Sequence, residues 1–141
     1  MADLTKEILA EKENIEIALA NLTEALSREE KTVIELTAIG AFMLNIYNGM
    51  ENILKQSQSA INIKTPNTDK WHKDLLNASV SNNILTEELT DKLYEYLTFR
   101  HFFVHGYGFR LEESRIEDLA SNMEKIWSQF LTEIQEFFKR M

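Results

Sequence analysis

Apolar side chains recur at helical intervals through most of the chain, and few helix-breaking residues interrupt them. The 141 residues include one proline and four glycines. Intervals of three, four and seven place side chains on one face of an α-helix, whereas a half-buried strand needs strict alternation. The first half has two such apolar stripes: Leu4, Ile8, Ile15, Leu19, Leu22 and Leu26, then Val33, Leu36, Ile39, Met43, Ile46, Tyr47, Met50, Ile53 and Leu54. They predict two long antiparallel helices joined near residues 27–31.

The second half predicts one short helix and two long ones. Residues 64–69 form a loop with the only proline, and Asp69 is expected to cap a short helix that carries Trp71, His72, Leu75 and Leu76. Residues 79–83 predict a second polar loop. Thr86 is expected to cap the fourth helix, whose apolar face is Leu89, Leu93, Tyr96 and Leu97 and which Gly106 and Gly108 would end. The last stripe starts near Glu113 and holds Ile116, Leu119, Met123, Ile126, Trp127, Phe130, Ile134, Phe137 and Phe138.

These elements define the expected fold. It is all-α, an antiparallel helical bundle of four long helices plus one short helix, in a single domain over residues 1–141. Gly40 and Gly49 lie inside the second helix, where glycine costs about 1 kcal/mol against alanine. Close approach of a neighbouring helix is one reason for glycine at these two positions.

Composition restricts the cellular setting. The chain has no cysteine, so it has neither disulfides nor a thiolate metal site, which suits a reducing cytoplasm. The N-terminal residues lack the apolar core of a signal peptide, and no apolar run approaches membrane-spanning length, so we expect a soluble protein without a membrane partner. The net charge of −8 means that any contact with nucleic acid depends on a local basic patch.

One octapeptide concentrates the residues with chemistry. It reads Arg100-His-Phe-Phe-Val-His-Gly-Tyr107 and contains two of the three histidines. Arginine binds two phosphate oxygens through its planar fork, and imidazole exchanges protons near neutral pH. A ribose 2′-hydroxyl can attack the adjacent phosphate when a base takes its proton and a cation stabilises the phosphorane. The spacing Arg-x4-His-x-Tyr therefore suits RNA cleavage, and this chemistry requires no metal or other cofactor.

The octapeptide resembles the Arg-x4-His-x-Tyr signature of HEPN-domain proteins of the HepT type, the ribonuclease toxins paired with a minimal nucleotidyltransferase (MNT) antitoxin. The segments Trp71-His-Lys-Asp-Leu-Leu76 and Phe99-Arg-His-Phe102 extend the likeness. His101 departs from it, because many members carry asparagine or aspartate there. By this resemblance Arg100 and His105 are the catalytic pair, in a homodimer whose two motifs meet. Tyr107 would be the tyrosine that the cognate MNT protein modifies with AMP.

Other polar residues keep more than one interpretation each. His101 either orients the site, touches RNA or packs in the core, and with His105 it also has the four-residue spacing of a metal-ligand pair. His72 either packs against its neighbours or contacts substrate. Arg110 either binds the RNA backbone or forms an ordinary salt bridge. Phe99, Phe102 and Phe103 are expected to divide between the core and an interface with a second copy or the antitoxin.

The sequence therefore favours one function over two others. The first is a metal-independent endoribonuclease toxin that acts on tRNA or mRNA and is silenced by adenylylation of Tyr107. The second is a non-catalytic helical module that only docks a nucleotidyltransferase. The third is a nucleotide-binding module that uses Arg100 for phosphate.

Overall fold

A computed structural model describes residues 3–105 and 113–141, and within these ranges the chain forms five helices and no strand. The helices are α1 (Lys6–Leu26), α2 (Val33–Ser59), α3 (Trp71–Ser81), α4 (Glu87–Val104) and α5 (Glu113–Lys139). The predicted all-α bundle of four long helices and one short helix is confirmed. Gly106, Gly108 and the other residues of 106–112 lie outside the described residues, so the predicted end of α4 at these glycines stays a prediction.

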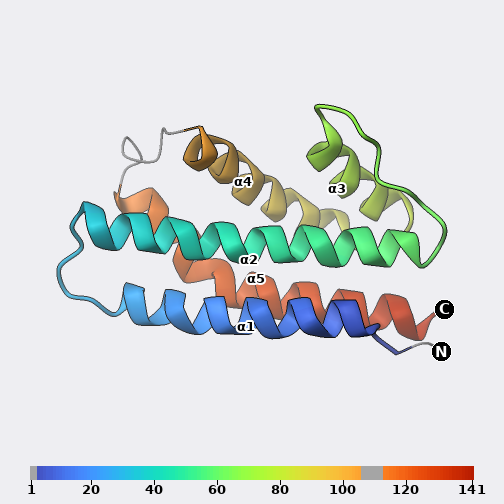
Figure 1. Cartoon of the computed structure of the whole chain (residues 1–141), viewed down its shortest axis with the longest axis horizontal. Helices are drawn as coiled ribbons and strands as arrows, with labels where there is room; N and C mark the ends of the chain where they lie inside the picture. Colours follow the sequence, from blue (N-terminus) through green and yellow to red (C-terminus); the bar gives the residue numbers. More distant parts are fainter. Residues whose placement is uncertain (1–2, 106–112) are drawn as a thin grey trace.

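Helix α2 is the centre of the bundle. Figure 1 shows α1 and α2 side by side and antiparallel, with α5 behind them and with α3 and α4 together on the opposite side of α2 from α1. Contacts join α2 to each of the other four helices. The predicted apolar stripes of α1, α2 and α5 supply most of the buried side chains, so burial of these faces accounts for the stability of the arrangement.

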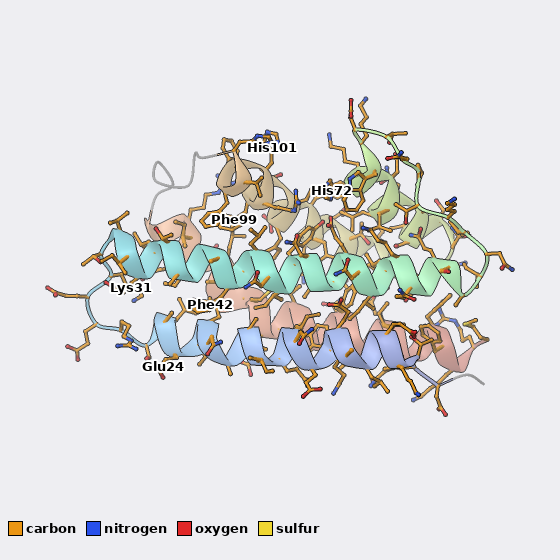
Figure 2. The ribbon with its side chains drawn as sticks, in the orientation of Figure 1. Glu24, Lys31, Phe42, His72, Phe99 and His101 are labelled. Carbon is orange, nitrogen blue, oxygen red and sulfur yellow. The ribbon has the colours of Figure 1, made fainter. Side chains whose placement is uncertain are left out.

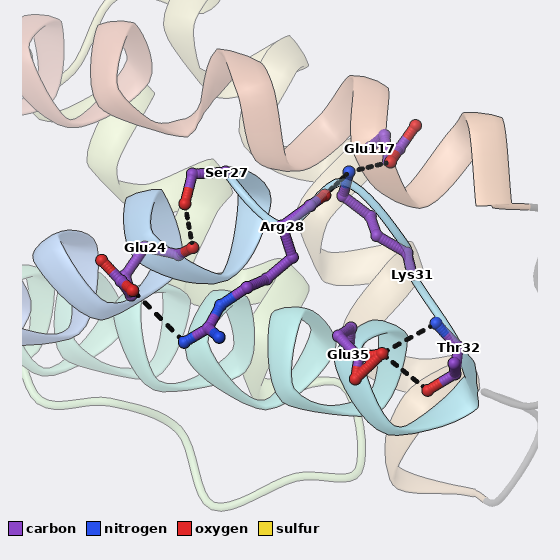
Figure 3. Close-up of polar contacts among 7 residues, drawn as sticks. All are labelled: Glu24, Ser27, Arg28, Lys31, Thr32, Glu35 and Glu117. Carbon is purple, nitrogen blue, oxygen red and sulfur yellow. Dashed lines mark hydrogen bonds and ion pairs between the residues drawn. The ribbon is translucent and has the colours of Figure 1, made fainter.

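The connection between α1 and α2 is fixed by local hydrogen bonds (Figure 3). The Thr32 backbone N–H and hydroxyl both donate to the Glu35 carboxylate, at 2.9 and 2.7 Å, and form a capping box at the start of α2. The hydrogen bond from the Thr32 hydroxyl is the main cause that lowers the pKa of Glu35. Lys31 pairs with Glu117 of α5 at 2.9 Å and so ties the connection to the last helix.

Both glycines of α2 lie where another side chain presses against the helix backbone. A Cβ atom at Gly49 would lie 2.5 Å from Ile15 Cγ1, and one at Gly40 would lie 2.5 Å from Cε2 of Phe103. Real Cβ contacts are not this short, so Gly49 permits the close approach of α1 and Gly40 that of the end of α4. The expected reason for these glycines is confirmed.

Three details differ from the sequence prediction. The N-cap of α3 is Lys70 rather than Asp69, and it makes no side-chain cap hydrogen bond; Thr68 instead closes this end, because its carbonyl accepts from Trp71 N and its hydroxyl donates to Asp74. The predicted loop over 79–83 is wrong for 79–81, which continue α3. Ser79 is buried there and is bonded to Gln58, so its polar side chain does not indicate a loop.

The third difference concerns Val33, which is 64% exposed although it belongs to the predicted apolar stripe of α2. Val33 is the first residue of the helix, so its side chain lies at the end of the bundle, where fewer neighbours cover it. Periodicity alone assigns it to the right face but does not say that the core ends before it.

By length and composition alone, α2 is also the one helix among the described residues that could cross a membrane. This differs from the expectation that no apolar run approaches that length. The core helix of a soluble protein meets the same criterion. The burial of Ile39, Met43, Ile46 and Met50 against the other helices accounts for the hydropathy of α2.

We expect Gly49→Ala to destabilise the protein. Overpacking against Ile15 costs about 1–3 kcal/mol, and the better helix propensity of alanine recovers only about 1 kcal/mol. Urea unfolding should show that Gly49→Ala and Ile15→Ala are not additive, because removing the Ile15 side chain makes room for the new methyl group. Additive losses in the double variant would show that this contact does not explain Gly49.

Candidate functional site around Arg100 and His72

The last turns of α4 carry the candidate catalytic residues, and this helix is fixed at both ends. Thr86 caps its start as predicted, accepting from Leu89 N, and Glu133 of α5 accepts from both the Thr86 backbone and its hydroxyl. Near its other end Phe99 is 5% exposed and packs in the core. Since α4 is anchored at its start by Thr86 and near its end by Phe99, the polar residues that follow Phe99 have defined positions.

Arg100 is partly buried and is held by α2. Its Nε donates to Oδ1 of Asn48 at 3.0 Å, across 52 residues of sequence. No partner is found for the two terminal guanidinium nitrogens among residues 3–105 and 113–141. A single hydrogen bond at Nε therefore orients the guanidinium. The two terminal nitrogens, which can bind two oxygens of one phosphate, stay available.

His72 is held in the same way by a second residue of α2. Its Nδ1 lies 2.7 Å from Oε2 of Glu51, whose carboxylate is almost completely buried. A buried carboxylate is stable only when a polar or charged partner compensates it, and His72 supplies that partner. An ionised carboxylate only accepts hydrogen bonds, so with Glu51 ionised the proton of this contact is on Nδ1, and Nε2 is the second functional nitrogen of the ring.

Trp71 completes the surroundings of His72. The two rings stack with centroids 3.5 Å apart, and the Lys55 ammonium lies 4.0 Å from the centroid of the Trp71 ring. His72 keeps a side-chain exposure of 19%, so it is neither free on the surface nor enclosed. The two interpretations of His72 are therefore compatible: it packs against Trp71 and still presents one edge to solvent.

Tyr47 lies at the centre of these contacts. Burial raises the pKa of its hydroxyl well above the ordinary value of 10.0, the Glu51 carboxylate raises it further, and Arg100 lowers it in part. Among residues 3–105 and 113–141 the hydroxyl has no partner that meets hydrogen-bond geometry, although Glu51 lies close enough to raise its pKa. The Tyr47 hydroxyl is therefore a dipole beside a charge, and Tyr47, Glu51 and Arg100 share one electrostatic environment.

The structure places the two histidines of the octapeptide together, and among the described residues neither is a hydrogen-bond partner of Arg100. His101 and His105 are exposed, with ring centroids 4.4 Å apart, and His105 is the C-cap of α4. Because both are exposed, a core role for His101 is wrong. In the described part of the chain no group of three or more candidate ligands could hold a metal ion, so this pair finds no third ligand there.

Two predicted residues are not placed. Tyr107 and Arg110 lie outside the described residues, so the structure does not test their roles. The phenylalanines divide as expected in part: Phe99 and Phe103 pack against the core, whereas Phe102 is 42% exposed. An interface at Phe102 stays a prediction.

The sequence analysis did not single out Asn48 and Glu51. One signal was available, because Glu51 is an acidic residue between Met50 and Ile53, within the long apolar stripe of α2. An acid at such a position must find a partner elsewhere. Nothing in the sequence identifies that partner as His72, which belongs to another helix 21 residues further on.

The fold and the site define the class of protein. An all-helical bundle whose fourth helix ends with an arginine and a histidine is consistent with the HEPN-like group. The sequence model of one protein family, described as HepT-like protein, matches residues 38–141. The chain therefore belongs to the HepT-like family. This family is related to HEPN ribonucleases and suggests a HEPN-type toxin. Searches of curated proteins and of solved structures each found no match.

The matched range includes the whole polar site. It begins inside α2 and covers Asn48, Glu51, His72, Arg100 and His105, whereas α1 lies outside it. Family membership therefore applies to the part of the chain in which α2, α3 and α4 meet.

We expect the pH dependence of stability to report on Tyr47. Its raised pKa in the fold gives a stabilising contribution that is fully present below the unfolded value of about 10 and is lost as pH rises above it. Tyr47→Phe should remove this contribution, so the free energy of unfolding should fall less between pH 7 and 11, by about 1.4 kcal/mol. Urea unfolding at pH 7, 10 and 11 measures the difference.

Tyr96→Phe is the matched comparison. The Tyr96 hydroxyl donates to the Leu119 carbonyl at 2.6 Å, so its removal should cost about 1 kcal/mol already at pH 7. Tyr47→Phe should cost little at pH 7, because its hydroxyl has no such bond. An unchanged alkaline slope in Tyr47→Phe would show that Tyr47 ionises normally.

Proposed function

We propose that the protein is the toxin of a HEPN/MNT (type VII-like) toxin–antitoxin pair, and that it is a cytoplasmic, metal-independent endoribonuclease acting on tRNA or mRNA. The observation that carries this proposal is the setting of Arg100 and His105 on α4. Asn48 orients the guanidinium and leaves its terminal nitrogens available, and His105 is exposed five residues further on, where α4 ends. Membership of the HepT-like family supports the same assignment.

The proposed reaction uses these groups in fixed roles. His105 takes the proton of the ribose 2′-hydroxyl, and the 2′-oxygen attacks the adjacent phosphorus. Arg100 binds the non-bridging oxygens as their charge grows in the phosphorane. The bond to the 5′-oxygen then breaks, and this oxygen leaves with a proton from an imidazolium. The products are a 2′,3′-cyclic phosphate and a 5′-hydroxyl.

A homodimer supplies the second imidazole. Each chain has one histidine at the motif position of His105, whereas the reaction needs one group to accept a proton and another to donate one. A two-fold axis brings the same surface of both subunits together, so His105 of the partner subunit can protonate the leaving oxygen. The exposed Phe102 and Val104 beside the motif support an apolar interface at the end of α4.

Adenylylation of Tyr107 would silence the enzyme. AMP on this tyrosine adds a bulky anion two residues after His105, and this anion would compete with the RNA phosphate for Arg100. The proposed partner is an MNT-type nucleotidyltransferase. A helical module that only docks this partner is the alternative, and the cleavage experiment separates the two.

Purified protein should cut tRNA in the presence of EDTA. We expect Arg100→Ala and His105→Ala each to lower the rate by about 100-fold or more, since each removes a charge-stabilising or proton-transfer group. Product ends identified by mass spectrometry should be 2′,3′-cyclic phosphates. Arg28→Ala is the matched control, because Arg28 is an exposed arginine of the α1–α2 connection whose ion pair is with Glu24 of α1, away from α4.

Cleavage that persists in both variants would remove the catalytic assignment of these residues. Absence of cleavage by unmodified wild-type protein on tRNA and mRNA, together with binding of a nucleotidyltransferase, would favour the docking module. Loss of activity in EDTA that Mg²⁺ restores would contradict metal independence.

Co-expression with an MNT-type nucleotidyltransferase should add the mass of one or more AMP groups to the chain. Intact-mass measurement detects the addition, and peptide mapping should assign it to Tyr107. Tyr107→Phe should abolish the addition. Tyr94→Phe, which changes a partly exposed tyrosine of α4, should not. Modification at a different residue, or none, would contradict the proposed regulation.

A further inference from the structure

We propose that His72 and Arg100 together form a phosphodiester-binding subsite for RNA, and that Glu51 is the positioning residue of His72. The proposal deepens the proposed function and rests on RNA as the substrate. Figure 2 shows His72 and His101, the neighbour of Arg100, on α3 and α4, two helices that lie on the same side of α2. The subsite extends the motif of α4 to a residue of a different helix.

The first argument is the charge of Glu51. Its carboxylate is 2% exposed and its hydrogen-bond partner is His72 Nδ1 at 2.7 Å. A packing role for His72 would not need a buried acid, because an apolar side chain of similar volume at position 51 avoids the cost of desolvation. A carboxylate behind an imidazole fixes the tautomer and stabilises the imidazolium, which are properties of a functional histidine.

The second argument is register along α2. Asn48 orients Arg100 and Glu51 orients His72, and the two α2 residues are three positions apart. Residues three apart lie on the same helix face, with a rise of roughly 4.5 Å between them. Tyr47, one turn before Glu51, is influenced by both Glu51 and Arg100. The guanidinium and the imidazole are therefore both bonded to one stripe of α2, through residues one turn apart.

The third argument concerns the chemistry of the ligand. Both groups present N–H donors: the terminal nitrogens of Arg100 and, when protonated, Nε2 of His72. Two donors of this kind match the non-bridging oxygens of a phosphodiester. Trp71 does not offer a platform for a base, because His72 stacks on its ring and Lys55 also lies over the ring. The subsite therefore binds the RNA backbone rather than its bases.

The test measures binding of a fully 2′-O-methylated oligoribonucleotide, which cannot be cleaved by attack of the 2′-oxygen, by fluorescence anisotropy. His72→Gln should weaken binding by about ten-fold or more, as expected when a hydrogen bond to a charged group is lost. Lys73→Ala is the matched control: it removes a full positive charge from the adjacent exposed residue and should weaken binding by no more than about three-fold.

Glu51 is tested by its effect on the His72 ring. Glu51→Gln keeps an oxygen that can accept from Nδ1 and should retain part of the affinity, whereas Glu51→Leu should lose as much as His72→Gln. Nitrogen-15 NMR of the ring should show Nδ1 protonated in the wild type and a mixture of tautomers in Glu51→Leu. A merely structural Glu51 would leave the tautomer unchanged.

The wild type gives a readout that does not depend on any variant folding. Titration with the oligonucleotide should shift the His72 ring nitrogens, and the absence of such a shift would overturn the subsite. Equal affinities of His72→Gln and Lys73→Ala would also overturn it. Binding that depends on His72 without cleavage of ordinary RNA would uphold the subsite and contradict the catalytic role of His105, so the two failures are distinguishable.

Discussion

A buried carboxylate on the central helix is the constraint on which the polar half of this structure depends. Glu51 belongs to the face of α2 that otherwise packs apolar side chains, and it is 2% exposed. Breaking a buried pair by removing one partner costs about 3–5 kcal/mol. His72 must therefore remain beside α2, and this contact fixes the start of α3. The position of Trp71 is fixed in turn, because its ring stacks on the imidazole. Burial raises the pKa of the Tyr47 hydroxyl, and the Glu51 charge raises it further.

Helix α4 is held to α2 by contacts of a different kind. Gly40 lets Phe103 press against the α2 backbone, and two turns further along Asn48 accepts from Arg100. The apolar contact brings the end of α4 close, and the hydrogen bond orients the arginine within that contact. Since both contacts are to one rigid helix, a change in the α2–α4 distance would move Arg100 relative to His72. Site geometry is thus a consequence of helix packing.

Sequence reasoning predicts the parts of this structure that repeat with a helical period. The apolar stripe that ends at Leu26 locates α1, and the one that begins near Ile116 locates α5. Burial of one helix face requires apolar residues at intervals of three and four, and the sequence shows this period directly. Sequence reasoning fails where a polar residue has a non-local partner. The polar side chain of Ser79 predicts a loop, but within α3 it bonds Gln58. Asn48 has no local feature that predicts its hydrogen bond from Arg100, 52 residues away. Local sequence carries no record of such pairs.

The overall charge makes this local arrangement more important for the proposed function. A chain of net charge −8 repels a polyanion over most of its surface, so the long-range field does not draw RNA to the protein. Affinity must then come from a few cationic groups in defined positions, and few phosphate contacts mean a shallow dependence on salt. Arg100 and His72 suit this requirement because each is fixed by a hydrogen bond to α2 before a ligand arrives. Little side-chain entropy remains to be lost on binding, which favours recognition of one RNA conformation over a general attraction to nucleic acid.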